Sequence, residues 1–252
     1  MNDRPIFQVR GLRKSYGAKR VLDGVDFDLG RRECLVVVGR SGTGKSVLLR
    51  QLIGLEQPQG GSILFDGQEV VGLSEAQLQP VRRRVAMLFQ GGALFDSMTV
   101  FDNLAFAFRE HRMARARELP EKVRELLLKV DLPGIEDRLP SDLSGGMRKR
   151  VALARALALE PEVMLFDEPT TGLDPMSSAS IAKLILATRE ATHCATLIVT
   201  HDMALTRRVA DRIAFLDQGK VRFLGTLEEA ENSPDPLLGA FLAGQEETAD
   251  VA

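Results

Sequence analysis

Three glycines, a lysine and a serine follow a short apolar stretch, and residues of these types at this spacing can hold a chain of phosphates. The stretch is Cys34 to Val38, and an apolar pattern with helical spacing begins after Ser46. Glycine lets the backbone curl so that successive N–H groups point into one concavity, where the new helix adds the positive end of its dipole. Lys45 is placed to reach the β- and γ-phosphates, and the Ser46 hydroxyl is a ligand for Mg²⁺. The predicted nucleotide-binding residues of this loop are Gly39, Arg40, Ser41, Gly42, Thr43, Gly44, Lys45, Ser46 and Val47.

Two adjacent carboxylates end another apolar stretch, Val163 to Phe166. A carboxylate in this position can hold Mg²⁺ opposite Ser46, and a second can orient and deprotonate the water that attacks the γ-phosphate. Adjacent acids in a loop are more often only solvated, but these come directly after a buried strand in a chain that has a phosphate loop. We therefore predict Asp167 as a metal ligand and Glu168 as the general base.

Single polar residues end two further apolar stretches. Gln90 follows Val85 to Phe89, and His201 follows Ala195 to Thr200. Because the carboxyl ends of parallel strands meet along one crevice, both side chains are expected near the γ-phosphate. A lone histidine is more often structural than catalytic, and it is the position of His201 that favours a role in the site.

A second pair of glycines opens a helix further along the chain. Ser144 is a good N-cap for the helical pattern that runs on to Ala158, with Gly145 and Gly146 in its first turn. Each glycine lowers helix stability by about 1 kcal/mol, so a close approach of another group to the backbone is the natural explanation. We interpret this segment as a second anion-binding helix start.

Tyr16 is the only tyrosine of the chain, and it is predicted to lie in a polar loop at residues 13–17 between the first two strands. A ring in such a loop could stack on a nucleotide base. The alternative interpretation is a tyrosine that covers the edge of a sheet.

The elements that must position these residues follow from the apolar patterns. Short alternation bounded by glycine and aspartate predicts antiparallel strands at residues 6–10, 21–29 and 62–65. Helical spacing predicts a helical insertion over 99–131 within an α/β body. Turn residues at 217–220 predict a hairpin near the C-terminus.

Composition limits the classes of function. The chain has 252 residues, of which 44% are hydrophobic and 27% charged, as in a soluble globular protein. No segment approaches the ~18 apolar residues of a membrane span, and the N-terminus shows no apolar signal region, so a cytoplasmic protein is expected. The formal net charge of −2 gives no electrostatic footprint for nucleic acid. The arginines at 82–84 and 109–117 are interpreted as parts of solvated helix faces. The alternative interpretation is that they contact lipid headgroups or an acidic loop of a partner.

The order and setting of these motifs resemble the ATP-binding subunits of ABC transporters over essentially the whole chain. A generic phosphate-loop kinase or GTPase has no Leu-Ser-Gly-Gly helix start and no histidine after the last core strand. The resemblance implies an α/β fold, with a P-loop ABC ATPase core, an antiparallel β subdomain and an inserted α-helical subdomain. It also implies a single ATP-binding domain over 1–252, with the helical subdomain at about 92–160 and a C-terminal tail at about 237–252.

The resemblance implies roles for the remaining site residues, with ATP and Mg²⁺ as cofactors. Tyr16 stacks on adenine, His201 contacts the γ-phosphate, and Gln90 touches Mg²⁺ or the attacking water and signals to a membrane partner. Asp174 links the active sites of two subunits that sandwich two ATP molecules head to tail. The implied metal ligands are Ser46, Gln90 and Asp167. The residues implied to cover the nucleotide of the other subunit are Ser144, Gly145, Gly146 and Met147.

Met147 departs from most of the family, which has glutamine there, and a methionine cannot hydrogen-bond the nucleotide in the same way. Together with the stretch from Gln90 to Thr99, however, the Leu-Ser-Gly-Gly-Met motif resembles the Mla-type branch, which powers phospholipid trafficking with MCE-domain proteins in bacterial envelopes. This implies a homodimer on the cytoplasmic side of the inner membrane, bound to an integral membrane permease, an MCE-domain protein and a small regulatory subunit. The alternatives are an amino-acid or lipoprotein cargo, or a non-transport module of the kind found in division and repair proteins.

Overall fold

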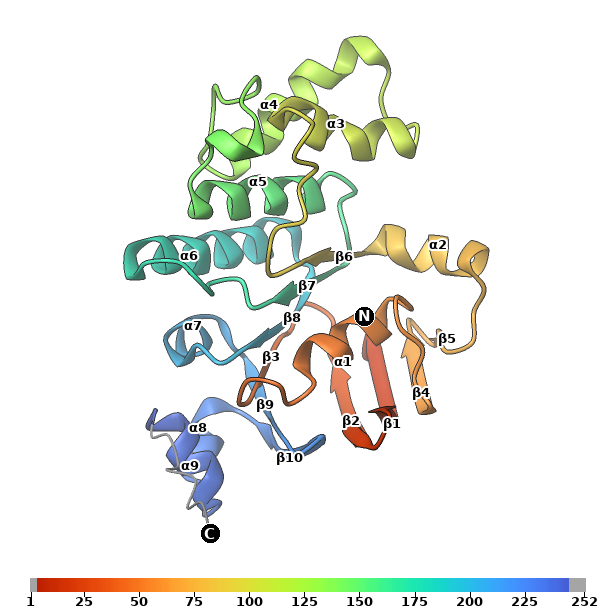
Figure 1. Ribbon diagram of the computed structural model, residues 1–252, viewed down its shortest axis with the longest axis vertical. Helices are drawn as coiled ribbons and strands as arrows, with labels where there is room; N and C mark the ends of the chain where they lie inside the picture. The colour runs from red at the N-terminus through yellow and green to blue at the C-terminus, as the bar shows by residue number, and fades with distance from the viewer. Residues whose placement is uncertain (1–3, 245–252) are drawn as a thin grey trace. The chain divides into compact units, whose positions relative to one another are not determined.

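The apolar strands predicted on either side of the phosphate loop are present in the structure, a computed structural model that describes residues 4–244. The chain divides into two compact units (Figure 1). The first consists of Met1–Leu78 together with Ala195–Ala252, and the second of Gln79–Cys194. The first unit therefore contains the phosphate loop, and the second contains the acidic pair and the Leu-Ser-Gly-Gly segment.

An antiparallel sheet in the first unit has the strand order β2-β1-β4-β5. The strands are β1 (Phe7–Tyr16), β2 (Lys19–Leu29), β4 (Gly60–Phe65) and β5 (Gln68–Glu69). Alternating apolar residues of β1 and β4 face the core, where the rings of Phe7 and Phe65 lie 5.0 Å apart. The three predicted antiparallel strands are thus confirmed, and each is longer at its N- or C-terminal end than the apolar pattern indicated.

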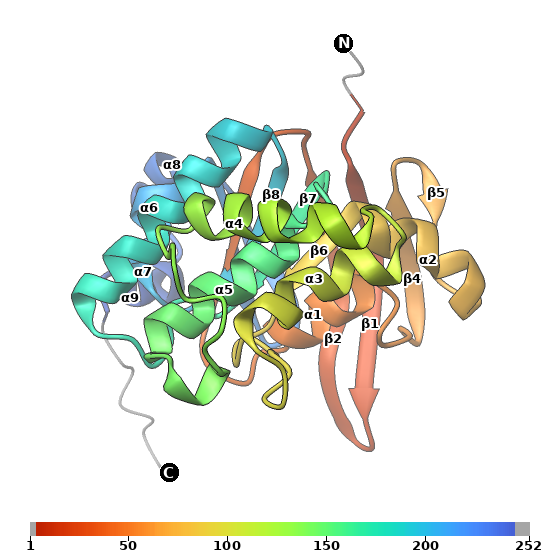
Figure 2. The ribbon, with the colours of Figure 1, turned by 90° about the horizontal axis from the view of Figure 1, so that it is seen from above.

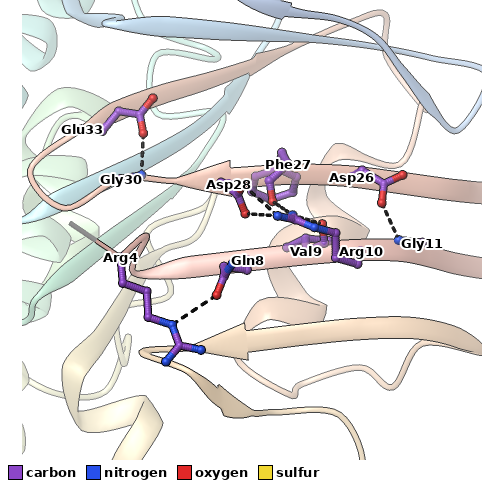
Figure 3. A network of polar contacts seen from close by, with 10 residues as sticks. All are labelled: Arg4, Gln8, Val9, Arg10, Gly11, Asp26, Phe27, Asp28, Gly30 and Glu33. Carbon is purple, nitrogen blue, oxygen red and sulfur yellow. Dashed lines mark hydrogen bonds and ion pairs between the residues drawn. The ribbon is translucent and has the colours of Figure 1, made fainter. Parts of the chain in front are cut away.

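The expectation that Tyr16 lies in a loop at 13–17 is wrong, because β1 continues through these polar residues and Tyr16 pairs with Lys19. A bulge at Gly11, whose φ is 58°, hides the continuity of the strand from the apolar pattern. The Gly11 N–H donates to the Asp26 carboxylate at 2.8 Å, so the displaced backbone keeps a partner. Figure 3 shows this bond beside the bonds from Arg10 to the carbonyl oxygens of Val9 and Phe27.

Parallel strands in the same unit carry the phosphate loop. The strand β3 (Cys34–Val38) lies between β8 (Ala195–Thr200) and β9 (Arg212–Asp217) and is parallel to both. The strand β10 (Lys220–Gly225) pairs antiparallel with β9. Every residue of β3 and β8 is buried, which explains their continuous apolar sequences. The predicted hairpin is confirmed, with its turn between Asp217 and Lys220. The helix α1 (Lys45–Leu52) begins directly after the loop, and α7 (Met203–Val209) follows β8.

The second unit combines a parallel strand pair with helices. The strands β6 (Val85–Leu88) and β7 (Val163–Asp167) pair in register. The longer helices are α3 (Val100–Glu110), α4 (Leu119–Lys129), α5 (Gly145–Leu157) and α6 (Pro175–Thr192), with short 3₁₀ turns at Ala116–Glu118 and Pro140–Asp142. Figure 2 shows α3, α4 and α5 side by side, as their mutual contacts require. The predicted helical insertion is thus confirmed as a helical segment.

The sequence indicated a helix at the arginines 82–84 but did not predict its extent. The helix α2 (Glu75–Arg84) is mostly polar and contains Pro80, so its apolar spacing rests on Leu78 and Val81 alone. A pattern with two apolar positions is too short to establish a period of 3.6 residues. Its last residues are the arginines at 82–84, which leaves them on a helix as the composition indicated.

The C-terminal helices pack on the first unit. A capping box at Thr226 opens α8 (Leu227–Glu231), which is followed by α9 (Pro236–Leu242). Leu238 of α9 is fully buried, and the Phe241 ring lies 5.2 Å from that of Phe215 in β9. The apolar part of the predicted tail therefore covers its own domain, and residues 245–252 of that tail lie outside the described residues.

We expect Leu238→Ala to destabilise the protein by about 2 to 5 kcal/mol, because it removes a fully buried side chain and leaves a cavity between α9 and its unit. Thermal unfolding measures the loss. Leu237→Ala is the matched control, since Leu237 on the same helix is only part-buried and should cost less. Equal melting temperatures for the wild type and Leu238→Ala would contradict this packing.

Two further features concern the described residues. The side chains of Cys34 and Cys194 are both buried. Among residues 4–244, no helix is both long enough and apolar enough to cross a membrane.

Candidate nucleotide site

The phosphate loop has two glycines that no other residue could replace without movement of the backbone. A Cβ atom on Gly39 would lie 2.3 Å from the carbonyl oxygen of Leu216, and one on Gly44 would lie 2.7 Å from Cγ1 of Val21. Gly44 also has φ of 100°, in the region that L side chains rarely adopt. The loop is therefore held close to β9 and β2 in a conformation that only glycine permits.

Lys45 is held inside the loop that it follows. Its side chain is buried, and Nζ donates hydrogen bonds to the carbonyl oxygens of Gly39 at 2.8 Å and Arg40 at 2.9 Å. The Thr43 hydroxyl donates to the same Arg40 oxygen at 2.9 Å. The N-cap of α1 is Gly44, which gives the first turn of the helix no side-chain cap. A phosphate group fits this arrangement, since it accepts hydrogen bonds from the first-turn N–H groups and from an ammonium.

His201 lies at the same sheet edge as the loop. In the parallel pair of β3 and β8, Val38 is opposite Thr200, so Gly39 and His201 each come one residue after the paired strands. His201 is exposed, and the next residue, Asp202, is the N-cap of α7 through a 3.0 Å bond from the Leu205 N–H. The register thus brings His201 to the edge of the sheet where the phosphate loop begins.

Tyr16 is anchored at its hydroxyl group, which donates to the Glu56 carboxylate. Lys14 Nζ lies 5.4 Å from the centre of the Tyr16 ring and 3.1 Å from Glu56 Oε1. The hydrogen bond to Glu56 raises the pKa of the Tyr16 phenol, so the phenol stays neutral. Tyr16 as a whole is 48% exposed, so its ring is accessible to a planar partner.

In the second unit, strand register aligns Gln90 with Glu168. Leu88 pairs with Phe166 in the parallel strands β6 and β7, and Gln90 and Glu168 each lie two residues further on. Gln90 is exposed, whereas Asp167 and Glu168 are buried. The predicted acidic pair is therefore not merely solvated at the surface.

Glu168 has an uncommon backbone conformation, with φ of 49°. A non-glycine residue with positive φ is held there by its surroundings and is frequent at active sites. The Thr171 hydroxyl donates to Glu168 Oε2 at 3.2 Å, and the amide N–H of Thr171 donates to the Glu168 carbonyl oxygen at 3.3 Å. Both contacts fix the orientation of the predicted general base.

The start of α5 has the cap that the sequence predicted, because Ser144 Oγ accepts from the Met147 N–H at 3.3 Å. Met147 is part-buried. Cβ atoms added at Gly145 and Gly146 would meet Leu173 Cδ2 and Ser177 Oγ, each at 3.5 Å, which is ordinary van der Waals contact. Within the described part of the chain, the expected close approach to these two glycines is therefore not found.

Asp174 caps α6. Its Oδ1 accepts from the N–H groups of Met176 and Ser177, each at 3.0 Å, and its Oδ2 from the Ser177 hydroxyl. These hydrogen bonds, above all the one from the Ser177 hydroxyl, lower the pKa of the Asp174 carboxyl. The role of Asp174 between two active sites stays a prediction.

Sequence reasoning missed the residues that hold the loop after Gln90. The buried Asn103 amide donates to the carbonyl oxygens of Phe95, Met98 and Thr99 at 3.0 to 3.1 Å and accepts from the Phe95 N–H at 2.8 Å. Arg155 donates to the Ala93 carbonyl oxygen at 2.7 Å, and its guanidinium stacks 5.4 Å from the Phe95 ring centre. The available signal was an asparagine four residues after the helix N-cap Thr99, on the apolar face of α3.

The fold, the phosphate loop of the first unit and the buried acidic pair of the second unit are typical of a phosphate-loop nucleotide hydrolase. The family model described as ABC transporter matches residues 22–171. Among curated proteins, the chain is 42% identical to a probable ribonucleotide transport ATP-binding protein of Mycobacterium leprae, over 94% of this chain and 69% of that protein. It is 38% identical to the intermembrane phospholipid transport system ATP-binding protein MlaF of Escherichia coli, over 95% and 89%. The chain therefore belongs to the ABC transporter family and is an ATPase.

Solved structures agree with this assignment. The ATP-binding cassette MJ0796, dimeric and bound to ADP and Pi, matches with a TM-score of 0.81 and 28% identity, over 88% of this chain and 98% of that chain. CbiO1 from Clostridium perfringens, part of the ABC transporter complex cbiONQ, matches with a TM-score of 0.83 and 28% identity, over 95% and 96%. The predicted α/β ABC ATPase fold is confirmed.

Proposed function

We propose that the chain is the ATP-hydrolysing subunit of a transporter that moves phospholipid across a bacterial envelope, together with a separate permease and an MCE-domain protein. The observation that supports phospholipid as the cargo is the 38% identity to MlaF over 89% of the length of MlaF. A chloroplast relative from Arabidopsis thaliana, TRIGALACTOSYLDIACYLGLYCEROL 3, is also 38% identical and bears the name of a lipid. The Leu143 to Met147 motif, with methionine after the glycines, supports the same branch.

In this proposal, residues of both units take part in ATP hydrolysis, each with a different role. Lys45 and the loop N–H groups bind the phosphates, and Tyr16 stacks on adenine. Glu168 accepts a proton from the attacking water, and His201 and Gln90 contact the γ-phosphate and the water. Within residues 4–244, no three His, Cys, Asp or Glu side chains form a metal cluster. Protein sites commonly bind Mg²⁺ through one or two carboxylates together with substrate phosphates.

Mg²⁺ held by Ser46, Asp167 and Gln90 would neutralise charge on the β- and γ-phosphates. The donor set suits this ion because all three side chains offer oxygen, which Mg²⁺ prefers. The protein would then contribute the positions of the nucleophilic water and of the base.

Two copies of the chain form the working dimer in this proposal. MJ0796, which is 28% identical, is dimeric in a solved structure. Gly145 and Gly146 offer backbone N–H groups at a helix start, and the described contacts of this chain do not explain why both are glycine. A phosphate of the nucleotide held by the second copy provides the close approach that would explain both. Asp174 then lies next to the same interface.

The loop after Gln90 is the proposed contact for the permease, which places the dimer at the cytoplasmic face of the inner membrane. Phe95 and Phe106 are exposed by 41% and 38%, and their rings lie 5.1 Å apart. Two neighbouring exposed aromatic rings are typical of a protein contact. Asn103 and Arg155 fix the backbone beneath them, so a movement of Gln90 can be passed on to the permease.

Asn103→Ala is expected to reduce association with the permease by about tenfold, since three carbonyl oxygens of the loop lose the hydrogen bond from the Asn103 side chain and the loop loses its shape. The permease retained on the tagged chain measures this effect. ATP affinity should stay within about twofold, because Asn103 lies outside the phosphate loop. Glu110→Ala, an exposed change on the same helix, is the control; if both variants retain the permease equally, the loop does not depend on Asn103.

Identification of the copurifying proteins tests the cargo. The tagged chain is isolated from gently solubilised membranes, and its partners are identified by mass spectrometry. A multi-span permease with an MCE-domain protein, with or without a small regulatory subunit, is expected. The name of the Mycobacterium leprae relative favours ribonucleotide transport as a second candidate, and a permease without an MCE-domain protein would support that candidate or another cargo. The absence of any membrane partner would instead favour a non-transport module.

A further inference from the structure

Lys149 is a buried lysine that binds the segment carrying Glu168. It lies on α5, one turn after the glycines of the Leu-Ser-Gly-Gly motif, and only 7% of it is exposed. Its Nζ donates to the carbonyl oxygens of Glu168 at 3.2 Å, Pro169 at 2.7 Å and Thr171 at 2.9 Å. An ammonium has three N–H groups, and here each has a carbonyl partner.

Burial of the Lys149 ammonium is unfavourable in free energy. A buried ammonium loses its hydration, and burial lowers the pKa of Lys149 while the nearby Glu168 charge raises it. An apolar residue on the same face of α5 would avoid that cost. The segment from Glu168 to Thr171 lies outside the helices and strands, and Glu168 has its uncommon φ of 49°. Lys149 supplies the donors that keep this backbone in one conformation.

We propose that Lys149 is a positioning residue, which fixes the segment from Glu168 to Thr171 so that the carboxylate of Glu168 is held in place for proton transfer. The inference rests on the proposed role of Glu168. It also gives a physical link between two parts of the site, because the helix that begins at Gly145 is bonded through Lys149 to the backbone of Glu168. When the start of α5 meets the nucleotide of the second copy, the same helix holds the base of its own copy in position.

The test compares Lys149→Met, which is unbranched and only one atom shorter than lysine but has no donor, with Lys149→Arg, which retains a cation and donors. Lys183→Met, which removes an exposed ammonium from α6 in the same unit, is the matched control. We expect Lys149→Met to lower kcat by about 10- to 100-fold, with KM and ATP affinity within about twofold, because a small displacement of a catalytic group affects the reaction more than binding. Lys149→Arg should recover most of the rate, and the control should match the wild type.

A double-mutant cycle distinguishes positioning from general stabilisation. In a Glu168→Gln background, Lys149→Met should cause little further loss, because the group that it positions is already removed. An equal fractional loss in both backgrounds, or an unchanged kcat in Lys149→Met, would overturn the role of Lys149. If Glu168→Gln alone keeps its turnover, the role of Glu168 fails first, and this outcome is visible without any Lys149 variant.

Hydrogen exchange provides a readout that does not depend on turnover. The N–H groups of Thr171 and Leu173 are bonded within the segment, to the carbonyl oxygens of Glu168 and Thr170. In folded Lys149→Gln, which retains fewer donors and is shorter, peptides covering 168–173 should exchange faster than in the wild type, and those of Lys183→Met should not. Unchanged exchange in Lys149→Gln would contradict the proposal.

Discussion

Replacing Glu168 by glutamine is expected to lower the rate of ATP hydrolysis by about 10² to 10⁴-fold while ATP binding is retained. Glutamine keeps the shape and the hydrogen bond from Thr171 but cannot accept a proton from water at neutral pH. The loss should appear in kcat, because the interaction is made in the transition state. Steady-state phosphate release and equilibrium binding of a fluorescent ATP analogue measure the two quantities separately.

Glu162→Gln is the control for this prediction. Glu162 comes just before β7, the strand that ends at Asp167, and forms an exposed ion pair with Arg84, so its change removes a carboxylate without touching the site. Exposed pairs of this kind contribute about 0 to 1 kcal/mol, and turnover should be unchanged. Turnover near the wild-type rate in Glu168→Gln would show that another group is the base.

Lys45→Met is expected to weaken ATP binding by about 10- to 100-fold, since a hydrogen bond to a charged group contributes about 1.5 to 3 kcal/mol. The buried Nζ is bonded to the carbonyl oxygens of Gly39 and Arg40, within the loop that the phosphates would enter. Methionine fills the same space without a charge. Isothermal titration with ATP and Mg²⁺ measures the change in affinity, and the melting temperature reports any change in the loop itself.

Lys220→Met provides the comparison, because Lys220 lies in the same unit, its side chain is 63% exposed, and its charge is also lost. Its ATP affinity should equal that of the wild type. The same affinity in Lys45→Met and Lys220→Met would mean that the phosphates do not depend on the ammonium of Lys45, and the loop would then need another interpretation.

The strands and the motifs were predictable because each depends on residues close together in the sequence. Buried parallel strands such as Cys34–Val38 and Ala195–Thr200 are continuous apolar runs, and their ends were predicted to the residue. The glycines at 39 and 44 were recognised by spacing, and the structure adds the contacts with Leu216 and Val21 that require them.

Long-range contacts explain what the sequence did not predict. Lys149 looks like an ordinary polar residue of an amphipathic helix, and only the fold brings it to the carbonyl groups of another segment. The end of β1 was missed for a similar reason, since its polar residues are strand residues only because β2 lies beside them. Tyr16 therefore lies at the end of a strand, with Glu56 fixing its hydroxyl group from 40 residues away.

We propose that hydrolysis at Glu168 drives the movement of phospholipid. The most direct test is to reconstitute the chain with its copurified membrane partners in vesicles and to follow a fluorescent phospholipid together with phosphate release. We expect lipid movement that requires ATP and Mg²⁺ and stops with Glu168→Gln, while ATP still binds. Lipid movement that continues unchanged in Glu168→Gln, or hydrolysis without any ATP-dependent movement of lipid, would contradict the proposal.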